Sequence, residues 1–377
     1  MRFAAWVVAV VGAAAGLTAC VTLPDSVAAE LRFREPGERA PYGTVVPASF
    51  DVDARDRGDN ATAPPRHEID TASLPLEHGQ IVVSEAGGAV SLFFSLFAVD
   101  DAPWVHAGIV AVEDGRAVVY EASGSFFPVP GLAPTATITG AVRRVGIERF
   151  VDGKRIVGLY APAPHIDRER LVAFARAQWQ RGTPFDPYFD SDDAEALYCT
   201  ELVALALAAG GATPETTALR TANPSLAVAR RWLRLRSDRV FLAGRLVATG
   251  REVGRWSTDL SSAQIDAYFA ARHALHTRFV DDVRLGELFR WTGFGLRLRE
   301  PVQRFVDDAL ALAADGRDAG DVIAGVEHLA HERFDAVDGT VARATPPRVI
   351  APRPTWAREP PWMQSPPTES SSSTPKP

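Results

Sequence analysis

Short apolar runs separated by turn residues dominate the first part of the foldable chain. Two of these runs flank Asp114-Gly115, and this dipeptide between apolar segments predicts a β-hairpin with a two-residue turn. Further runs rich in Val, Ile and Ala have the length of β-strands. The predicted strands are residues 80–84, 105–113, 116–122, 141–147, 155–160 and 239–242.

Helical patterns lie between these runs. Residues 90–99 form an apolar segment, and residues 200–209 form another that ends at a Gly-Gly pair. Asp167 is a suitable N-cap for a third helix, which should end at Gly182. Strands and helices mixed in this order predict an α+β domain over residues 71–255.

The last third and the flanking segments of the chain differ from this domain. Apolar residues between 256 and 345 recur at spacings of three and four, which predicts a helical extension. Residues 21–70 mix Pro, Gly, Asp and Arg without an apolar period, as in a flexible tether. Residues 346–377 contain ten prolines and a run of four serines, which predicts a disordered tail.

The N-terminus has the pattern of an export signal. Arg2 precedes an apolar run at residues 3–16, and Leu17-Thr18-Ala19-Cys20 follows it. The run is too short for a permanent membrane span, so residues 1–20 predict a lipoprotein signal peptide with Cys20 as the lipidated residue. The alternative is an ordinary signal peptide that contains a cysteine. We expect an exported protein, lipid-anchored in the bacterial cell envelope and facing the periplasm if the cell is Gram-negative.

Charge and cysteine content narrow the range of functions. The net charge of −7 and the absence of a Lys/Arg cluster argue against nucleic acid as a partner. The chain has two cysteines, so lipidation of Cys20 would leave Cys199 without a disulfide partner. An unpaired thiol in an exported protein is either buried or used as a nucleophile.

The predicted hairpin brings a histidine and a carboxylate together. With Asp114-Gly115 as the turn, Gly108 lies opposite Glu121, and His106 lies diagonal to Glu121 on the same face. Gly108 then leaves space for the carboxylate to lean toward the imidazole. A shift of the pairing by one residue would place the two side chains on opposite faces.

Cys199 lies at the start of the predicted helix 200–209. The positive end of a helix dipole and a nearby imidazolium both lower the pKa of a thiol. Cys199 as nucleophile, His106 as base and Glu121 as orienting acid therefore form a candidate catalytic triad. Glu201 is interpreted as a first-turn acid that the helix dipole favours, not as a second catalytic acid.

Three motifs occur in this order along the chain. They are Trp104-Val105-His106-Ala107-Gly108-Ile109-Val110, Val119-Tyr120-Glu121-Ala122, and Pro184-Phe185-Asp186 leading through Asp192-Asp193 to Leu197-Tyr198-Cys199-Thr200-Glu201-Leu202-Val203. In these segments the chain resembles the permuted NlpC-type papain-like cysteine hydrolases, and specifically their YiiX/YaeF group, over residues 76–211.

The resemblance implies a fold and an activity. The fold would be a circularly permuted papain-like domain, in which the strand with His106 precedes the helix with Cys199. The activity would be that of an amidase or peptidase that acts through an acyl-thioester on Cys199, with His106 and Glu121 as its partners. Expected substrates are peptides or acyl amides, with cell-envelope peptides first.

Other functions remain open. The same chemistry on a lipid acyl group would make the protein an acyltransferase or a thioesterase, and loss of catalysis would leave an envelope scaffold. Tyr198, Phe126 and Phe127 are candidate substrate-binding residues, the two phenylalanines because they follow the Glu121 strand in a predicted loop.

Two groups of residues have a composition compatible with metal binding. Asp186, Asp190, Asp192 and Asp193 lack the Gly and the terminal Glu of a calcium loop. The histidine pairs of the helical extension have no Cys or further His nearby in the sequence. We therefore expect neither a metal site nor a cofactor.

Overall fold

The computed structural model describes the chain between residues 69 and 335, with gaps. The described ranges are 69–124, 140–193, 195–219, 226–227, 230, 235–280, 285–292, 295–313 and 318–335. Cys20, Phe126, Phe127 and the Pro-rich tail 346–377 lie outside them. The chain divides into two units, Met1–Asp338 and Gly339–Pro377, and every described residue belongs to the first.

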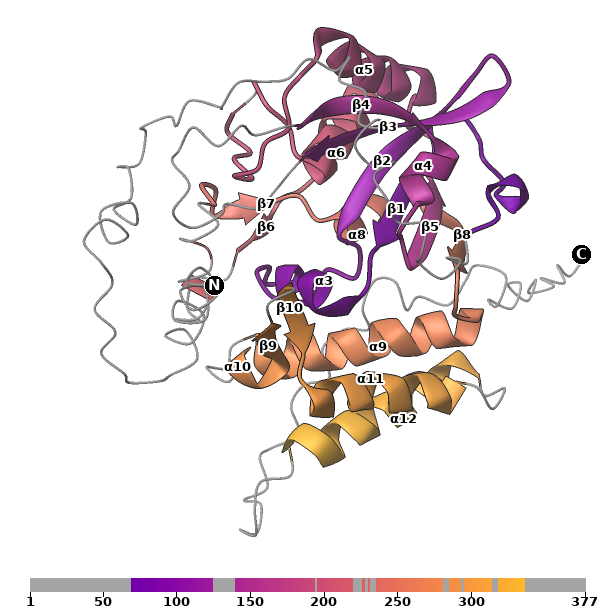
Figure 1. Cartoon of the computed structure of the whole chain (residues 1–377). Coiled ribbons are helices and arrows are strands. Elements are labelled where there is room, and N and C mark those ends of the chain that lie inside the picture. Colours follow the sequence, from indigo (N-terminus) through magenta and orange to yellow (C-terminus); the bar gives the residue numbers. More distant parts are fainter. Residues whose placement is uncertain are drawn as a thin grey trace, which may run out of the picture. The chain divides into compact units, whose positions relative to one another are not determined.

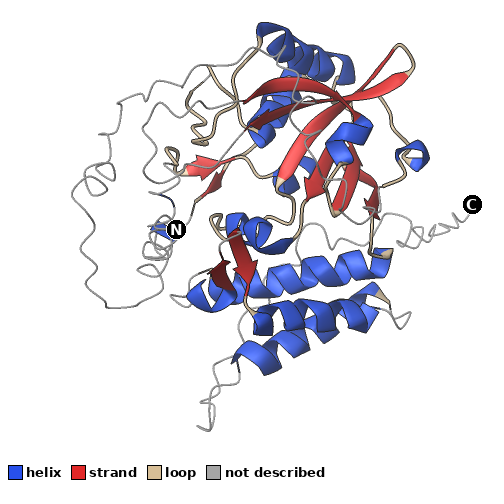
Figure 2. Ribbon diagram, in the orientation of Figure 1, coloured by secondary structure: helices blue, strands red, loops and turns tan. Residues whose placement is uncertain are grey.

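Six strands of the described chain form one antiparallel sheet in the order β4-β3-β2-β1-β5-β8, with helices on both faces (Figures 1 and 2). The predicted α+β class is therefore confirmed. The strands are β1 (Ile81–Glu85), β2 (His106–Glu113), β3 (Arg116–Gly124), β4 (Gly140–Gly146), β5 (Ile156–Ala161) and β8 (Arg251–Ser257). The predicted strand at 239–242 is reduced to the two-residue β7 (Arg239–Val240), which pairs with β6 (Thr217–Ala218).

The β2–β3 hairpin has the predicted turn. Asp114 and Gly115 have φ angles of 50° and 75°, the left-handed values that a two-residue hairpin turn of this type requires. Glu113 pairs with Arg116 across it, as the turn chemistry predicts. This register fixes which side chains of β2 and β3 share a face.

Helix α5 begins and ends at the capping residues that the sequence predicts. In α5 (Arg168–Arg181), the Asp167 side chain accepts from the Arg170 N–H at 3.0 Å, and Gly182 ends the helix with φ 68°. These two predictions are confirmed. The other helices next to the sheet are α3 (Gly88–Ser95), α4 (Ile147–Val151), α6 (Cys199–Ala209) and α8 (Ala243–Val247).

The two faces of the sheet have different cores. On one face, Val110 of β2 and Val119 of β3 are buried against Ile147 and Phe150 of α4. Side chains alternate between faces along a strand, so Ile109 and its neighbours at two-residue spacing point the other way. Helix α6 packs against β2 and β3 and against α5. The sheet therefore separates α4 from most of α6.

The C-terminal region is mainly helical, in the elements α9 (Ser262–Phe279), α10 (Leu285–Leu288), α11 (Glu300–Leu312) and α12 (Ala319–Ala330). The prediction of helix throughout is wrong at β9 (Phe289–Thr292) and β10 (Gly295–Leu298), which form an antiparallel hairpin. In Gly-Leu-Arg-Leu the apolar residues alternate with a period of two, which favours a strand over a helix. Within the described part of the chain, no helix combines the length and apolar character needed to cross a membrane.

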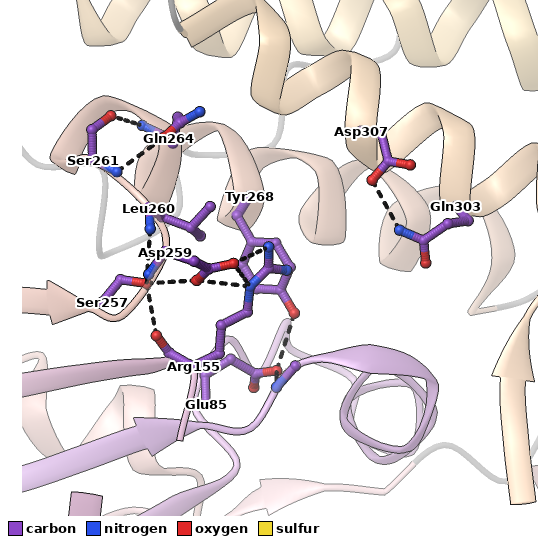
Figure 3. Close-up of polar contacts among 11 residues, drawn as sticks. Glu85, Arg155, Ser257, Asp259, Leu260, Ser261, Gln264, Tyr268, Gln303 and Asp307 are labelled. Carbon is purple, nitrogen blue, oxygen red and sulfur yellow. Dashed lines mark hydrogen bonds and ion pairs between the residues drawn. The ribbon is translucent and has the colours of Figure 1, made fainter. Parts of the chain in front are cut away.

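Helix α9 is attached to the sheet by two sets of polar contacts, and Figure 3 shows the first of them. Near its start, Arg155 bonds Asp259 at 3.0 Å, while the Tyr268 hydroxyl donates to Glu85 at 3.2 Å. One turn further on, Arg272 forms an ion pair with Glu85 at 2.5 Å, and both side chains are almost fully buried. Because Glu85 ends β1, these bonds connect the helical region to the strand beside β2.

Candidate active site

The candidate nucleophile lies at the first position of α6. Cys199 is buried, and it forms no disulfide in the described chain. Tyr198, the N-cap, has an extended backbone, and its N–H donates to the Glu201 carboxyl at 3.4 Å. The backbone N–H groups of Thr200 and of Ala107 in β2 act on the thiol and help to lower its pKa. The helix start and the neighbouring strand therefore both provide donors to the sulfur.

The N–H of Ala107 is directed to the thiol because β2 and β3 diverge. The β1–β2 pairing runs to Ser84–His106, whereas the paired residues of β2 and β3 end at Ile109–Tyr120. Backbone groups alternate in direction along a strand, and the N–H and C=O of Val110 bond to residues just before β1. The N–H of Ala107 therefore faces the space where β3 has moved away.

This divergence corrects the expected role of Gly108. The ladder ends one pair before Gly108 and Glu121, so the two residues are not paired. A Cβ atom on Gly108 would lie 2.5 Å from Val119 Cγ1 and 3.2 Å from Phe150 Cε2. Gly108 is needed for the close approach of these two core side chains, not to make room for the carboxylate.

His106 is held on both its edge and its face. Its Nε2 lies 2.5 Å from Glu121 Oε2, and its ring stacks on Phe150 with a centroid distance of 5.5 Å and an interplanar angle of 22°. The imidazole also interacts with the thiol of Cys199, and this interaction helps to raise the pKa of His106. Because Nε2 is bound to Glu121, Nδ1 is the nitrogen left for the sulfur. The structure thus brings together the three residues that the sequence analysis selected.

Sequence reasoning missed a fourth charged residue at this site. Arg143 of β4 lies opposite Glu121 in the β3–β4 register, and its Nη2 donates to Glu121 Oε1 at 2.6 Å. Burial raises the pKa of Glu121, but the bonds from His106 and Arg143 outweigh it and hold the pKa at about 2. Glu121 is therefore ionised throughout the range in which the protein would work.

The electrostatics of the two side chains favour a charged pair. Burial lowers the pKa of His106, but the nearby sulfur of Cys199 and the carboxylate of Glu121 raise it to about 9. Burial raises the pKa of Cys199, while the imidazolium and the two backbone donors lower it below its ordinary value. The arrangement can therefore keep a thiolate next to an imidazolium, which supplies a nucleophile and a proton donor in contact.

Tyr198 occupies a structural position. It is fully buried, and its hydroxyl bonds Ser191 Oγ at 2.8 Å and accepts from the Phe241 N–H at 3.1 Å. Its ring packs on the ring of Phe189, with a centroid distance of 4.9 Å. The side chain thus fixes the start of α6 against two loops, and none of its surface is available to a substrate.

Glu201 is not the charged first-turn acid that the sequence suggested. Its side chain is buried, and burial together with Asp186, Asp190 and Asp193 raises its pKa to about 9. The carboxyl is therefore neutral at pH 7. Asp186 is also buried and accepts from the backbone N–H groups of Tyr188 and Asp190 at 2.7 and 2.5 Å, which makes it a turn-capping residue.

A pocket of about 400 Å³ adjoins the imidazole and its carboxylate partner. Its walls come from β2, β3, β4, α4 and the turn that follows α4. The lining residues are His106, Glu121, Ser123, Arg143, Arg149, Phe150, Asp152 and Lys154. No group of three or more His, Cys, Asp or Glu residues in the described ranges has the arrangement of a metal site.

Comparisons with known proteins give one distant likeness. Neither a protein family nor a curated protein matches the sequence. Among solved structures, the chain is similar to the metalloprotein YiiX from Escherichia coli O157:H7, with a TM-score of 0.38 and 14% sequence identity. The alignment covers 49% of this chain and 99% of that protein.

Proposed function

We propose that this protein is a cysteine hydrolase of the amidase or peptidase class, in which Cys199 is the nucleophile. One observation supports this function above all others. A buried thiol at a helix start interacts with an imidazole whose Nε2 is held by a carboxylate at 2.5 Å. Nucleophile, base and orienting acid in contact form the arrangement that activates a thiol for acyl transfer.

The geometry supports a two-stage reaction. The thiolate of Cys199 attacks the substrate carbonyl, and the imidazolium of His106 gives its proton to the departing amine, which leaves an acyl-thioester. Water then attacks the thioester, His106 takes up its proton, and the carboxylic acid and the Cys199 thiolate are released. Glu121 keeps the imidazole oriented and favours its protonated form. Backbone N–H groups at the start of α6 are suitable donors to the oxyanion.

We further propose that the domain is a permuted papain-like domain of the YiiX/YaeF type. The order of the elements supports this assignment. The strand that begins with His106 precedes the helix that begins with Cys199, and the acid follows on the next strand, as the sequence resemblance implies.

The favoured substrates are peptides of the cell envelope, reached from a lipid anchor on Cys20. The lipoprotein pattern at residues 1–20 supports this location. The pocket beside His106 is lined mainly by charged side chains, which suit a polar substrate better than an acyl chain. An acyltransferase or thioesterase would use the same first stage with another acyl donor or acceptor.

The test is to incubate the purified protein with cell-wall peptide fragments and follow both products and enzyme by mass spectrometry. We expect new carboxyl and amino termini, and an acyl adduct on the peptide that contains Cys199 when the reaction is stopped by acid. Cys199→Ala should abolish both. If wild-type protein forms neither product nor adduct with peptide, ester or thioester substrates, the hydrolase proposal is wrong. The protein would then be better explained as a non-catalytic envelope scaffold.

A further inference from the structure

The pocket beside His106 has an uneven balance of charge. Three of its lining side chains are cations, Arg143, Arg149 and Lys154, and two are carboxylates, Glu121 and Asp152. A thiolate–imidazolium pair at Cys199 and His106 is neutral as a unit. The pocket therefore contains one positive charge more than its own carboxylates balance.

The surplus charge can be assigned to one side of the pocket. Arg143 bonds Glu121 at 2.6 Å, and Arg149 lies 3.4 Å from Asp152. Lys154, in the turn between α4 and β5, forms no ion pair with any residue of the described chain. Lys154 is half-buried and lines the pocket, where its ammonium can meet a ligand that enters.

We propose that this pocket binds a carboxylate of the substrate, next to the carbonyl that Cys199 attacks; this inference rests on the proposed function. A single negative charge would balance the pocket, whereas a phosphate dianion would leave it negative. An uncharged acyl chain would remove water from several charged groups without replacing their hydrogen bonds. The substrate class that fits is therefore an acidic peptide, with a carboxylate close to the scissile bond.

The test uses two thiol reagents of nearly equal shape, iodoacetate and iodoacetamide, which differ by one negative charge. Their rates of reaction with Cys199 are measured on the full chain by mass spectrometry of the peptide that contains Cys199. The readout is the ratio of the iodoacetate rate to the iodoacetamide rate. A cation near the sulfur raises this ratio, and a carboxylate lowers it.

Charge changes in the pocket should move the ratio in opposite directions. Lys154→Gln should lower it about threefold to tenfold, and Asp152→Asn should raise it, because each removes one charge near the reagent. Lys154→Arg should keep the wild-type ratio. Arg170→Gln, on the exposed side of α5 and outside the pocket, is the matched control and should also leave the ratio unchanged.

The outcomes separate this inference from the proposed function. An unchanged ratio in both Lys154→Gln and Asp152→Asn would overturn the carboxylate site, even if Cys199 reacts rapidly with both reagents. A slow reaction of Cys199 with iodoacetamide that His106→Ala does not alter would count against the proposed function, while the ratio would still report the charge of the pocket.

Discussion

Arg143 donates to the Glu121 carboxylate oxygen that His106 leaves open, at 2.6 Å, while His106 holds the other oxygen at 2.5 Å. The carboxylate of Glu121 in β3 is therefore bonded by side chains from both neighbouring strands, β2 and β4. A carboxylate with both oxygens engaged keeps one orientation, and it holds the imidazole edge that faces it in place. The geometry of His106 thus depends on a residue of β4 that does not touch the sulfur.

Replacing His106 should change the titration of the thiol. The imidazolium is a main cause of the lowered pKa of Cys199, and burial opposes it. In His106→Ala we expect the pKa of Cys199 to rise toward or above the ordinary value of a cysteine, because burial is then no longer opposed by the imidazolium. The ultraviolet absorbance of the thiolate, followed against pH, measures this change, with Cys199→Ala as the blank. Superimposable titrations of wild type and His106→Ala would contradict an ion pair.

Replacing Glu121 should narrow the pH range of the charged pair. The carboxylate helps to raise the pKa of His106 to about 9, so the imidazolium persists up to that pH in the wild type. In Glu121→Gln the pKa of His106 falls, and the alkaline limit of hydrolysis should move below pH 9. We expect the hydrolysis rate at neutral pH to fall by about tenfold or more.

Arg143 should act by positioning Glu121. Arg143→Gln leaves the negative charge of Glu121 in place but frees one of its oxygens. We expect kcat to fall with little change in the alkaline limit, because the carboxylate still supports the imidazolium. Arg143→Lys should recover part of the rate. An alkaline limit that moves as far as in Glu121→Gln would show that Arg143 does more than orient.

The buried ion pair between Arg272 and Glu85 should dominate the attachment of α9. The two side chains are 3% and 0% exposed and lie 2.5 Å apart. Arg272→Met leaves an unpaired buried carboxylate, which should cost about 3–5 kcal/mol in the free energy of unfolding. Chemical denaturation measures this loss.

Two variants test whether the loss comes from the buried charge. Arg304 pairs with Glu300 at 3.5 Å on the surface, so Arg304→Met should cost about 1 kcal/mol or less. Adding Glu85→Gln to Arg272→Met removes the unpaired charge and should restore part of the stability. A double variant less stable than Arg272→Met would indicate that lost packing, not charge, is the cause.

The N-terminal prediction is tested by the behaviour of the protein in detergent. With lipidated Cys20, the full chain should partition into the detergent phase, and Cys20→Ser should move it to the aqueous phase. Equal partitioning of wild type and Cys20→Ser would refute the anchor.

Removal of residues 346–377 should leave the melting temperature nearly unchanged, because the tail has no apolar period to bury.

The sequence was most informative where structure depends on neighbouring residues. The Asp114-Gly115 turn determines the register of β2 and β3, and the Asp167 cap determines the start of α5; both follow from local chemistry. The divergence of β2 from β3 could not be predicted in this way. It depends on how α6 packs against β2 and β3, which short-range chemistry does not determine.

Arg143 and Phe150 were missed for a related reason. A segment of 15 residues, 125–139, connects β3 to β4, so no turn chemistry fixes the register that places Arg143 opposite Glu121. Phe150 reaches His106 through tertiary packing of the short helix α4. The neutral state of Glu201 depends on burial, which sequence position alone does not reveal.

Glu201 should make the protein less stable as the pH rises. Its pKa is raised from 4.5 to about 9 on folding, so between these values the folded state binds a proton that the unfolded state releases. Stability from this group is therefore complete below pH 4.5 and is lost progressively toward pH 9. Glu201→Gln removes the titration, and its amide oxygen can still accept from the Tyr198 N–H. At pH 8 we expect the variant to be more stable than wild type by about 1 kcal/mol or more.

The pH dependence of stability distinguishes the contribution of Glu201 from the contributions of other carboxyl groups. Burial raises the pKa of Asp186 to about 6, so its contribution lies below that value and should persist in Glu201→Gln. Glu169, in the first turn of α5, is exposed, and Glu169→Gln is the matched control for loss of a first-turn charge. Melting temperatures of the three proteins from pH 5 to 9 provide the measurement. Because the advantage of Glu201→Gln comes from the proton alone, it should shrink toward zero at pH 5; an advantage that is constant with pH would mean that the carboxyl is already ionised in the folded protein.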